Sequence, residues 1–447
     1  MRPFQAVPVG VALLLSFRLP AADLVVPVVL DVRSGAAHYR TELTLTNRGA
    51  TPVALTIAYR GSLGGAAGGV SEEVRAGTQR TIPDVVAWLE ARGVSFPGLR
   101  EGAPHAGTLR LTVPDGETAT FAALARTTTP TFAPPPEGAA GLAYSAVGPS
   151  SASVGRAVVH GLRATETERS NLAVWNPGAS PVTVRIVAAS GTGDGREVVV
   201  ADGWTLEPGE WRQVDGILAK AGLHQGWAVV ERVGGGAFSA YGVVNDGGTN
   251  DGSFLEAASD AASPGAVVVP VLIETPGFRT ELILANRGTA AAPLELDYRE
   301  SLSPAAGPGG RATVTLAPRE QRIVADAFAW LRGLGIAAGP AGNAPLAGRL
   351  RVTGPPGGTG LWAAARVASP SRGGGAYGVF LPGARPGPAS GAEAWIAGLR
   401  SDAEVRSNVA ILHAGPPGSG AVELEVRAFD GLAGGATAGG PAQYALA

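Results

Sequence analysis

A ten-residue motif that occurs four times constrains the fold of this chain more than any other feature. The first copy reads Arg40-Thr-Glu-Leu-Thr-Leu-Thr-Asn-Arg-Gly49, and the others begin at Arg169, Arg279 and Arg406. Apolar and polar residues alternate inside each copy, which is the period-two pattern of a half-buried β-strand. The sequence therefore predicts one β-structured unit repeated four times.

A second alternating run follows each of the first three copies, at residues 53–59, 182–186 and 294–298. The copies before these runs end in Asn-x-Gly, and both Asn and Gly tolerate the positive φ of a tight turn. The two runs together predict a β-hairpin with one apolar face. A second sheet must cover that face.

The copies alternate between two kinds. The first and third begin Arg-Thr-Glu-Leu, whereas the second and fourth begin Arg-Ser-Asn. This order indicates that a pair of domains, A and B, was duplicated. The expected organisation is a signal peptide (1–22), repeat A1 (23–148), repeat B1 (149–263), repeat A2 (264–386) and a truncated repeat B2 (387–447).

Each intact repeat also contains further alternating runs and one short helical pattern. The helices are expected after Asp84, Asp215 and Asp326, whose carboxylates suit the start of a helix. They are expected to end before Gly93, Gly222 and either Gly333 or Gly335, since glycine suits the end of a helix. Seven or eight strands in this length match an immunoglobulin-like sandwich. The predicted fold class is all-β: tandem immunoglobulin-like β-sandwich domains, each with one short inserted α-helix.

Composition narrows the environment of the chain. Residues 1–22 have a basic residue, an apolar core and a small-residue end, which is typical of a secretory signal peptide. There is no cysteine, and the formal net charge is −2 without basic runs. We therefore expect a secreted, extracellular or cell-surface protein without disulfides, which neither binds nucleic acid nor inserts into the membrane when mature.

The run from Leu43 to Ile57, Leu-x-Leu-x-Asn-x-Gly-x-x-Pro-Val-x-Leu-x-Ile, resembles the strands of bacterial extracellular immunoglobulin-like modules of the cell-adhesion-related, CARDB-like type. The resemblance covers about 15 residues per repeat, close to the length of a single two-stranded unit. It implies a non-catalytic module in a secreted or surface protein.

The fourth copy contains only the first part of a repeat, from Trp395 to Ala447. Half a sandwich exposes an apolar face and open edges. We therefore expect the sequence to be a fragment of a longer protein, whose repeats form an elongated array.

One loop could bind a cation. Residues 245–253 read Asn-Asp-Gly-Gly-Thr-Asn-Asp-Gly-Ser, and Asp246, Asn250 and Asp251 carry the oxygen ligands that Ca²⁺ prefers. A glycine-rich turn between two strands explains the same residues. No other cofactor is indicated, and no motif or spacing predicts an active site.

Three tryptophans of repeat B1 stand where the other repeats carry small or polar residues: Trp175, Trp211 and Trp227. The alternation of their strands turns them away from the apolar side, so we expect them to be exposed. They would then bind a sugar ring or a peptide, or pack at a domain junction. The five histidines are expected in loops or on the surface. The repeated arginines are expected to bond carboxylates or loop carbonyls inside each sandwich and to serve the fold.

These observations favour a non-catalytic binding, adhesion or spacer region rather than an enzyme. Its partners would be a surface glycan or a protein. Two alternatives remain open: accessory domains of a larger secreted hydrolase, and a carbohydrate-binding array that uses the tryptophans of repeat B1.

Overall fold

The computed structural model describes residues 21–114, 116–131, 138–259, 265–302, 309–339, 345–355, 360–385, 393–415 and 420–446. Antiparallel strands dominate it, so the all-β prediction is confirmed. The helical segments are α1 (Val85–Glu90), α2 (Ile217–Lys220), α3 (Ala327–Gly333) and the 3₁₀ turn η1 (Pro149–Ser151). Most of the predicted signal peptide lies outside the described residues, and its last two residues open the first strand.

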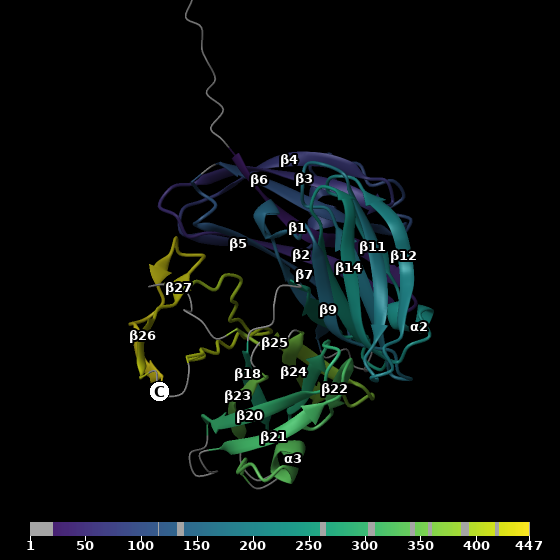
Figure 1. The fold of residues 1–447 in the computed structure, drawn as a ribbon. Helices are drawn as coiled ribbons and strands as arrows, with labels where there is room; N and C mark the ends of the chain where they lie inside the picture. The colour runs from purple at the N-terminus through teal and green to yellow at the C-terminus, as the bar shows by residue number, and fades with distance from the viewer. Residues whose placement is uncertain are drawn as a thin grey trace, which may run out of the picture.

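The strands form three consecutive groups and a C-terminal stretch (Figure 1). Group one contains β1 (Ala21–Ser34), β2 (Ala37–Asn47), β3 (Val53–Leu63), β4 (Ala67–Val74), β5 (Thr78–Ile82), β6 (His105–Pro114), β7 (Phe121–Pro130) and β8 (Ala139–Ser145). Group two contains β9 (Arg156–Arg163), β10 (Glu168–Trp175), β11 (Val182–Ser190), β12 (Glu197–Leu206), β13 (Trp211–Val214), β14 (Gln225–Gly235), β15 (Ser239–Asp246), β16 (Gly252–Glu256) and β17 (Ala258–Ser259). Group three contains β18 (Ala266–Glu274), β19 (Arg279–Asn286), β20 (Ala292–Glu300), β21 (Gly310–Leu316), β22 (Glu320–Val324), β23 (Leu346–Thr353), β24 (Leu361–Pro370) and β25 (Ala376–Pro382). The C-terminal stretch contains β26 (Val422–Val426), β27 (Phe429–Asp430), β28 (Ala436–Thr437) and β29 (Ala442–Leu446).

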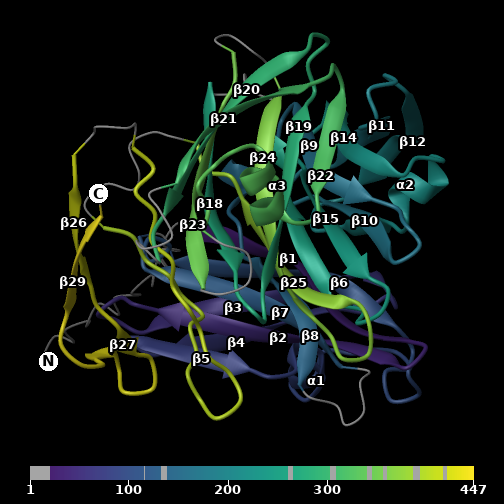
Figure 2. The ribbon, with the colours of Figure 1, turned by 90° about the horizontal axis from the view of Figure 1, so that it is seen from below.

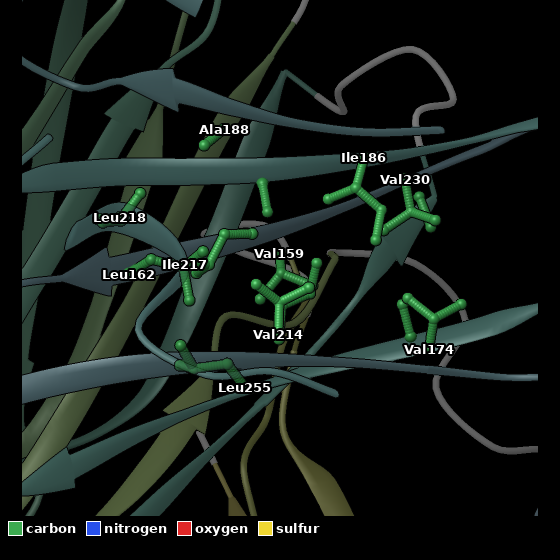
Figure 3. Packing of buried hydrophobic residues seen from close by; sticks show 14 of the residues in the cluster. Val159, Leu162, Val174, Ile186, Ala188, Val214, Ile217, Leu218, Val230 and Leu255 are labelled. Atoms are coloured by element: carbon green, nitrogen blue, oxygen red, sulfur yellow. The ribbon is translucent and has the colours of Figure 1, made fainter. Parts of the chain in front are cut away.

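Group two consists of two sheets that share one apolar core. The strand orders are β12-β11-β14-β9-β17 and β13-β10-β15-β16. Figure 3 shows inward side chains from both sheets meeting in this core, among them Val159, Ile186 and Val230 from the first and Val174 and Leu255 from the second. Group three is built in the same way, with orders β18-β23-β20-β21 and β22-β19-β24-β25.

Group one joins its two layers through the long strand β1. Residues Ala21–Asp31 of this strand pair with β6, and Asp31–Ser34 pair with β2. Its core contains the alternating residues of the motif, including Leu43 and Leu45, both fully buried. The predicted burial of the apolar face is therefore confirmed in the three groups.

The prediction of a β-hairpin is wrong. β2 and β3 lie in one sheet but do not pair, and β10 and β11, like β19 and β20, belong to different sheets. The chain therefore crosses from one layer to the other at each Asn-x-Gly. The alternating residues of the two runs face each other across the core and do not share one face.

A buried asparagine holds each crossing in place. Asn176 is fully buried, and its Nδ2 donates to the carbonyl oxygens of Ser180 (2.8 Å) and Leu206 (3.0 Å). Its Oδ1 accepts from the amide of Gly178 at 2.9 Å. Asn47 and Asn286 make equivalent bonds. The expected positive φ is not observed at the glycines of these three turns, Gly49, Gly178 and Gly288.

Several local predictions agree with the structure. Asp84 and Asp326 accept from the amides of Ala87 and Ala329 and so begin α1 and α3. The glycines after the three helices, Gly93, Gly222 and Gly335, have positive φ. Asp215 is an exception, because Gly216 occupies the position before α2 and donates its amide to Asn171 Oδ1.

The groups follow one another around a centre, with the C-terminal stretch beside group one (Figure 1). Figure 2 shows this stretch beside the strands of groups one and three. The expected elongated array is therefore wrong. Several apolar residues of the stretch are exposed: Ile396 by 57%, Val409 by 46% and Ile411 by 44%.

Candidate functional site

The loop between β15 and β16 is the place where the three groups meet. It begins at Asp246, which is 5% exposed and closes the turn on itself. Its Oδ1 accepts from the amides of Gly248 (2.9 Å) and Thr249 (2.8 Å). Its Oδ2 accepts from the amide of Ala376 in group three at 3.0 Å.

Asp251 joins group two to both neighbours. Its Oδ1 accepts from the amide of Gly141 in β8 at 3.1 Å, and its Oδ2 accepts from the amide of Gly378 in β25 at 2.8 Å. Gly141 and Gly378 occupy the same position in their groups, each opposite the third residue from the end of its partner strand. Burial raises the pKa of Asp251 above its ordinary value, although both N–H donors act in the opposite direction.

Asn250 adds a contact to group one. Its Nδ2 donates to the hydroxyl of Tyr39 in β2, and its Oδ1 accepts from Arg169 at 3.2 Å. Asn250 has a φ of 58°, a conformation that Asn adopts more readily than most residues. The loop is therefore a polar junction between three groups, which we call the junction loop (residues 245–253).

This geometry does not support the calcium hypothesis. The carboxylate oxygens of Asp246 and Asp251 face backbone N–H groups, whose positive ends repel a cation. Within the part of the chain that the structure describes, no group of three or more His, Asp or Glu residues is placed to hold a metal ion. The alternative from the sequence, a turn of Asn, Asp and Gly between two strands, describes the observed loop.

Two of the three tryptophans fill the junction between groups one and two. Trp175 is 5% exposed and packs with Tyr241 of β15, Tyr144 of β8 and Val25 of β1. Trp211 is partly buried in the same cluster, and its Nε1 donates to the hydroxyl of Tyr241 at 3.1 Å. The expected exposure of Trp175 is wrong, because the face opposite the core of group two is covered by group one.

Trp227 lies at the other junction of group two and is 1% exposed. It packs with Val158 and Val229, and its ring centroid is 6.5 Å from that of His160. His160 in turn stacks on Trp362 of group three at 4.7 Å. The expected exposure of Trp227 is therefore also wrong. The structure supports the second interpretation of Trp175 and Trp227, packing at a junction.

A buried ion-pair network crosses from group two to group three. Arg163 is 2% exposed, and its two terminal nitrogens bind the two carboxylate oxygens of Glu281, each at 2.6 Å. Glu168 lies 3.4 Å from Arg163 and 3.5 Å from Arg366. Such bidentate pairs fix orientation as well as distance.

Five of the repeated arginines form ion pairs within their groups, as predicted, whereas Arg169 donates to the side-chain oxygen of Asn250. Arg40 pairs with Asp84 at 3.5 Å and Arg279 with Asp326 at 3.2 Å. The second set of arginines does the same, with pairs Arg80–Glu72, Arg212–Glu210 and Arg322–Glu320. These pairs lie near the surface and do not cross between groups.

Sequence reasoning missed His160 and Arg163. His160 and His105 are buried, contrary to the expectation of surface histidines. Burial and the nearby Arg287 charge hold the pKa of His160 well below its usual range. A usable signal for Arg163 existed, because Gly-Leu-Arg at 161–163 and 398–400 stands at the same distance before the motif in both B-type copies.

No family model, curated protein or solved structure matches the chain. In the part of the chain that the structure describes, no helix is both long enough and apolar enough to cross a membrane.

Proposed function

We propose that the chain is an exported, non-catalytic scaffold made of tandem immunoglobulin-like β-sandwich domains, with the boundaries 23–148, 149–263, 264–386 and 387–447. It serves as a binding, adhesion or spacer region, as the resemblance to CARDB-like modules implies. The observation that supports this function best is the junction loop, because one short loop bonds three groups. A chain of independent domains does not need such a loop.

Fixed junctions suit a spacer or an adhesion region, since they hold surface loops of different domains at set distances. The contacts involved are buried and charge-assisted: Asp251 bonds two neighbours, and Arg163 binds Glu281. Breaking either contact leaves a buried polar group without a partner, which costs about 1–3 kcal/mol or more. Relative motion of the domains is therefore opposed.

Electron-paramagnetic distance measurements test the scaffold. The chain has no cysteine, so spin labels can be placed on Leu63→Cys in group one and Phe278→Cys in group three, both exposed positions. We expect one narrow distance distribution, with singly labelled chains as controls. A broad distribution, as from flexibly linked domains, would contradict a fixed scaffold.

Expression of the full chain in a secreting bacterial host tests export. Intact mass of the product outside the cytoplasm should correspond to cleavage after Ala22. A full-length product confined to the cytoplasm would remove the proposed extracellular role, whatever the distance measurements show.

A further inference from the structure

The C-terminal stretch repeats the start of group two. Residues 395–400 correspond to 158–163, residues 409–411 to 172–174, and residues 422–426 to 182–186. The pairing agrees with this alignment, since β26 pairs antiparallel with β29 as β11 pairs with β12. Contacts made by group two can therefore be compared position by position with those of the C-terminal stretch.

Gln321 of β22 makes three hydrogen bonds to the backbone of group two. It is 1% exposed. Its Oε1 accepts from the amide of Gly161 at 2.9 Å, and its Nε2 donates to the carbonyl of Leu162 at 3.2 Å. Its own amide donates to the carbonyl of Gly191 at 2.8 Å.

Gln79 of β5 makes the same three bonds to the C-terminal stretch. Its Oε1 accepts from the amide of Gly398 at 2.9 Å, and its Nε2 donates to the carbonyl of Leu399 at 3.1 Å. Its amide donates to the carbonyl of Gly431 at 2.9 Å. Gln79 is the equivalent of Gln321, since Thr46 and Ala285 of the repeated motif pair with them.

The ion pair of this junction is repeated too. Arg400 binds Glu42 at 2.9 Å, as Arg163 binds Glu281. The amide of Arg400 donates to Ser407 Oγ, as that of Arg163 donates to Ser170 Oγ. Glu42 and Glu281 occupy the same place in the motif.

The junctions made by β6 of group one and β23 of group three also match each other. Arg110 of group one donates to the carbonyl of Gly178 in group two at 3.1 Å. Arg351, its equivalent in group three, donates to the carbonyl of Gly415 in the C-terminal stretch at 3.3 Å. Around the molecule, arginine junctions therefore alternate with glutamine junctions. The last junction, at Gln79, joins the C-terminal stretch to group one.

We infer that the four copies close into a ring with approximate two-fold symmetry, in which each A-type repeat carries a binding surface for the Gly-Leu-Arg strand of a B-type repeat. The surface consists of one Gln and one Glu: Gln79 and Glu42 in group one, Gln321 and Glu281 in group three. Its occupant in group one is the chain's own C-terminal stretch. We call this contact the closing junction.

Aromatic residues distinguish the two surfaces. In group three the large Trp362 faces His160 of group two. In group one Ala122 takes the place of Trp362, and the C-terminal stretch instead carries Trp395, which stacks on Phe429 at 5.2 Å and on the Arg48 guanidinium at 4.6 Å. The facing pair Trp362 and His160 is large, whereas the equivalent pair Ala122 and Ala397 is small, so the two A-type surfaces differ in shape and favour different B-type strands.

A disulfide test uses the full chain, in which introduced cysteines are the only ones. A Cβ on Gly431 would lie 2.5 Å from Cβ of Gln79, and the matched pair at the other junction, Gly191 and Gln321, has 2.7 Å. In both pairs the two strands must move apart by about 1 Å to reach disulfide spacing, so the control meets the same requirement. The variants are Gln79→Cys with Gly431→Cys, and Gln321→Cys with Gly191→Cys as the control.

We expect both variants to form the bond within one monomer, seen by intact mass under non-reducing conditions and by size-exclusion chromatography. A covalent dimer through residues 79 and 431 would overturn closure within the chain. Absence of this bond while the control forms it would do the same.

A second test exchanges the charges of Glu42 and Arg400 and introduces no cross-link. Glu42→Arg should speed amide hydrogen exchange at Gly398 and Arg400, whose amides are hydrogen-bonded, about tenfold, which corresponds to 1.4 kcal/mol. The double variant Glu42→Arg with Arg400→Glu should restore the protection. Equal exchange in all three proteins would contradict the closing junction.

Discussion

Several polar residues buried at the junctions have partners on two groups, such as Asp251 and Gln321, whereas His160 does not. Among the described residues, neither of its ring nitrogens has a hydrogen-bond partner. It lines a cavity of about 230 Å³ with Arg287, Arg385 and Glu256, so two of the three charged neighbours are cationic. The folded chain therefore keeps His160 neutral.

This neutrality predicts a pH dependence of stability. The pKa of His160 is lowered in the folded chain, whereas an unfolded histidine has a pKa of about 6.5. Below that value the unfolded chain binds a proton that the folded chain does not bind. The free energy of unfolding should then fall as the pH falls below about 6.5, by up to about 1.4 kcal/mol per pH unit from this residue.

Urea unfolding between pH 7 and 5 measures this slope. His160→Ala, which places in group two the residue found at the equivalent position 397, should remove the contribution. His224→Ala, at an exposed position, is the control and should keep it. An unchanged slope in His160→Ala would show that the residue is not kept neutral by its surroundings.

At the scale of elements, the strands were predictable and their partners were not. The period-two pattern located most strands. The register of β1 and β18 shifts around prolines 27 and 270, because proline lacks the N–H that a regular ladder needs. The same pattern describes a strand in either sheet of a sandwich. The crossing at Asn176 therefore looked like a hairpin turn, because alternation does not reveal which layer the second run joins.

The buried asparagine is expected to be essential for the crossing. Asn176→Ala removes three hydrogen bonds and leaves the carbonyls of Ser180 and Leu206 without this donor, so it should destabilise the chain by about 2–4 kcal/mol. Asn176→Asp should not rescue it, since a carboxylate has no N–H to donate. Thr183→Ala, which removes a bond near the surface, should cost less than about 1 kcal/mol in the same chemical denaturation. Equal effects of the two alanine variants would contradict this role.

At the scale of the whole molecule, the order of the repeats followed from the sequence, and their arrangement did not. A repeated motif predicts a shared unit, but some contacts between units depend on residues that differ between copies, such as Trp175. The tryptophans illustrate the limit. Alternation showed correctly that Trp175 points away from its own core, and only the position of group one shows that this second face is covered.

Asp251 gives the arrangement of the molecule its most direct test. Asp251→Ala leaves the amides of Gly141 and Gly378 unpaired at two junctions at once, and each unpaired buried amide costs about 1–3 kcal/mol. Because these costs fall on junctions and not on the cores of the groups, the groups should become less coupled rather than unfold. Calorimetry should show separated transitions in Asp251→Ala where the parent chain shows strongly overlapping ones. Asp202→Ala, at an exposed position of β12, should keep the parent profile. An Asp251→Ala profile identical to the parent would mean that the three groups are held together without this carboxylate.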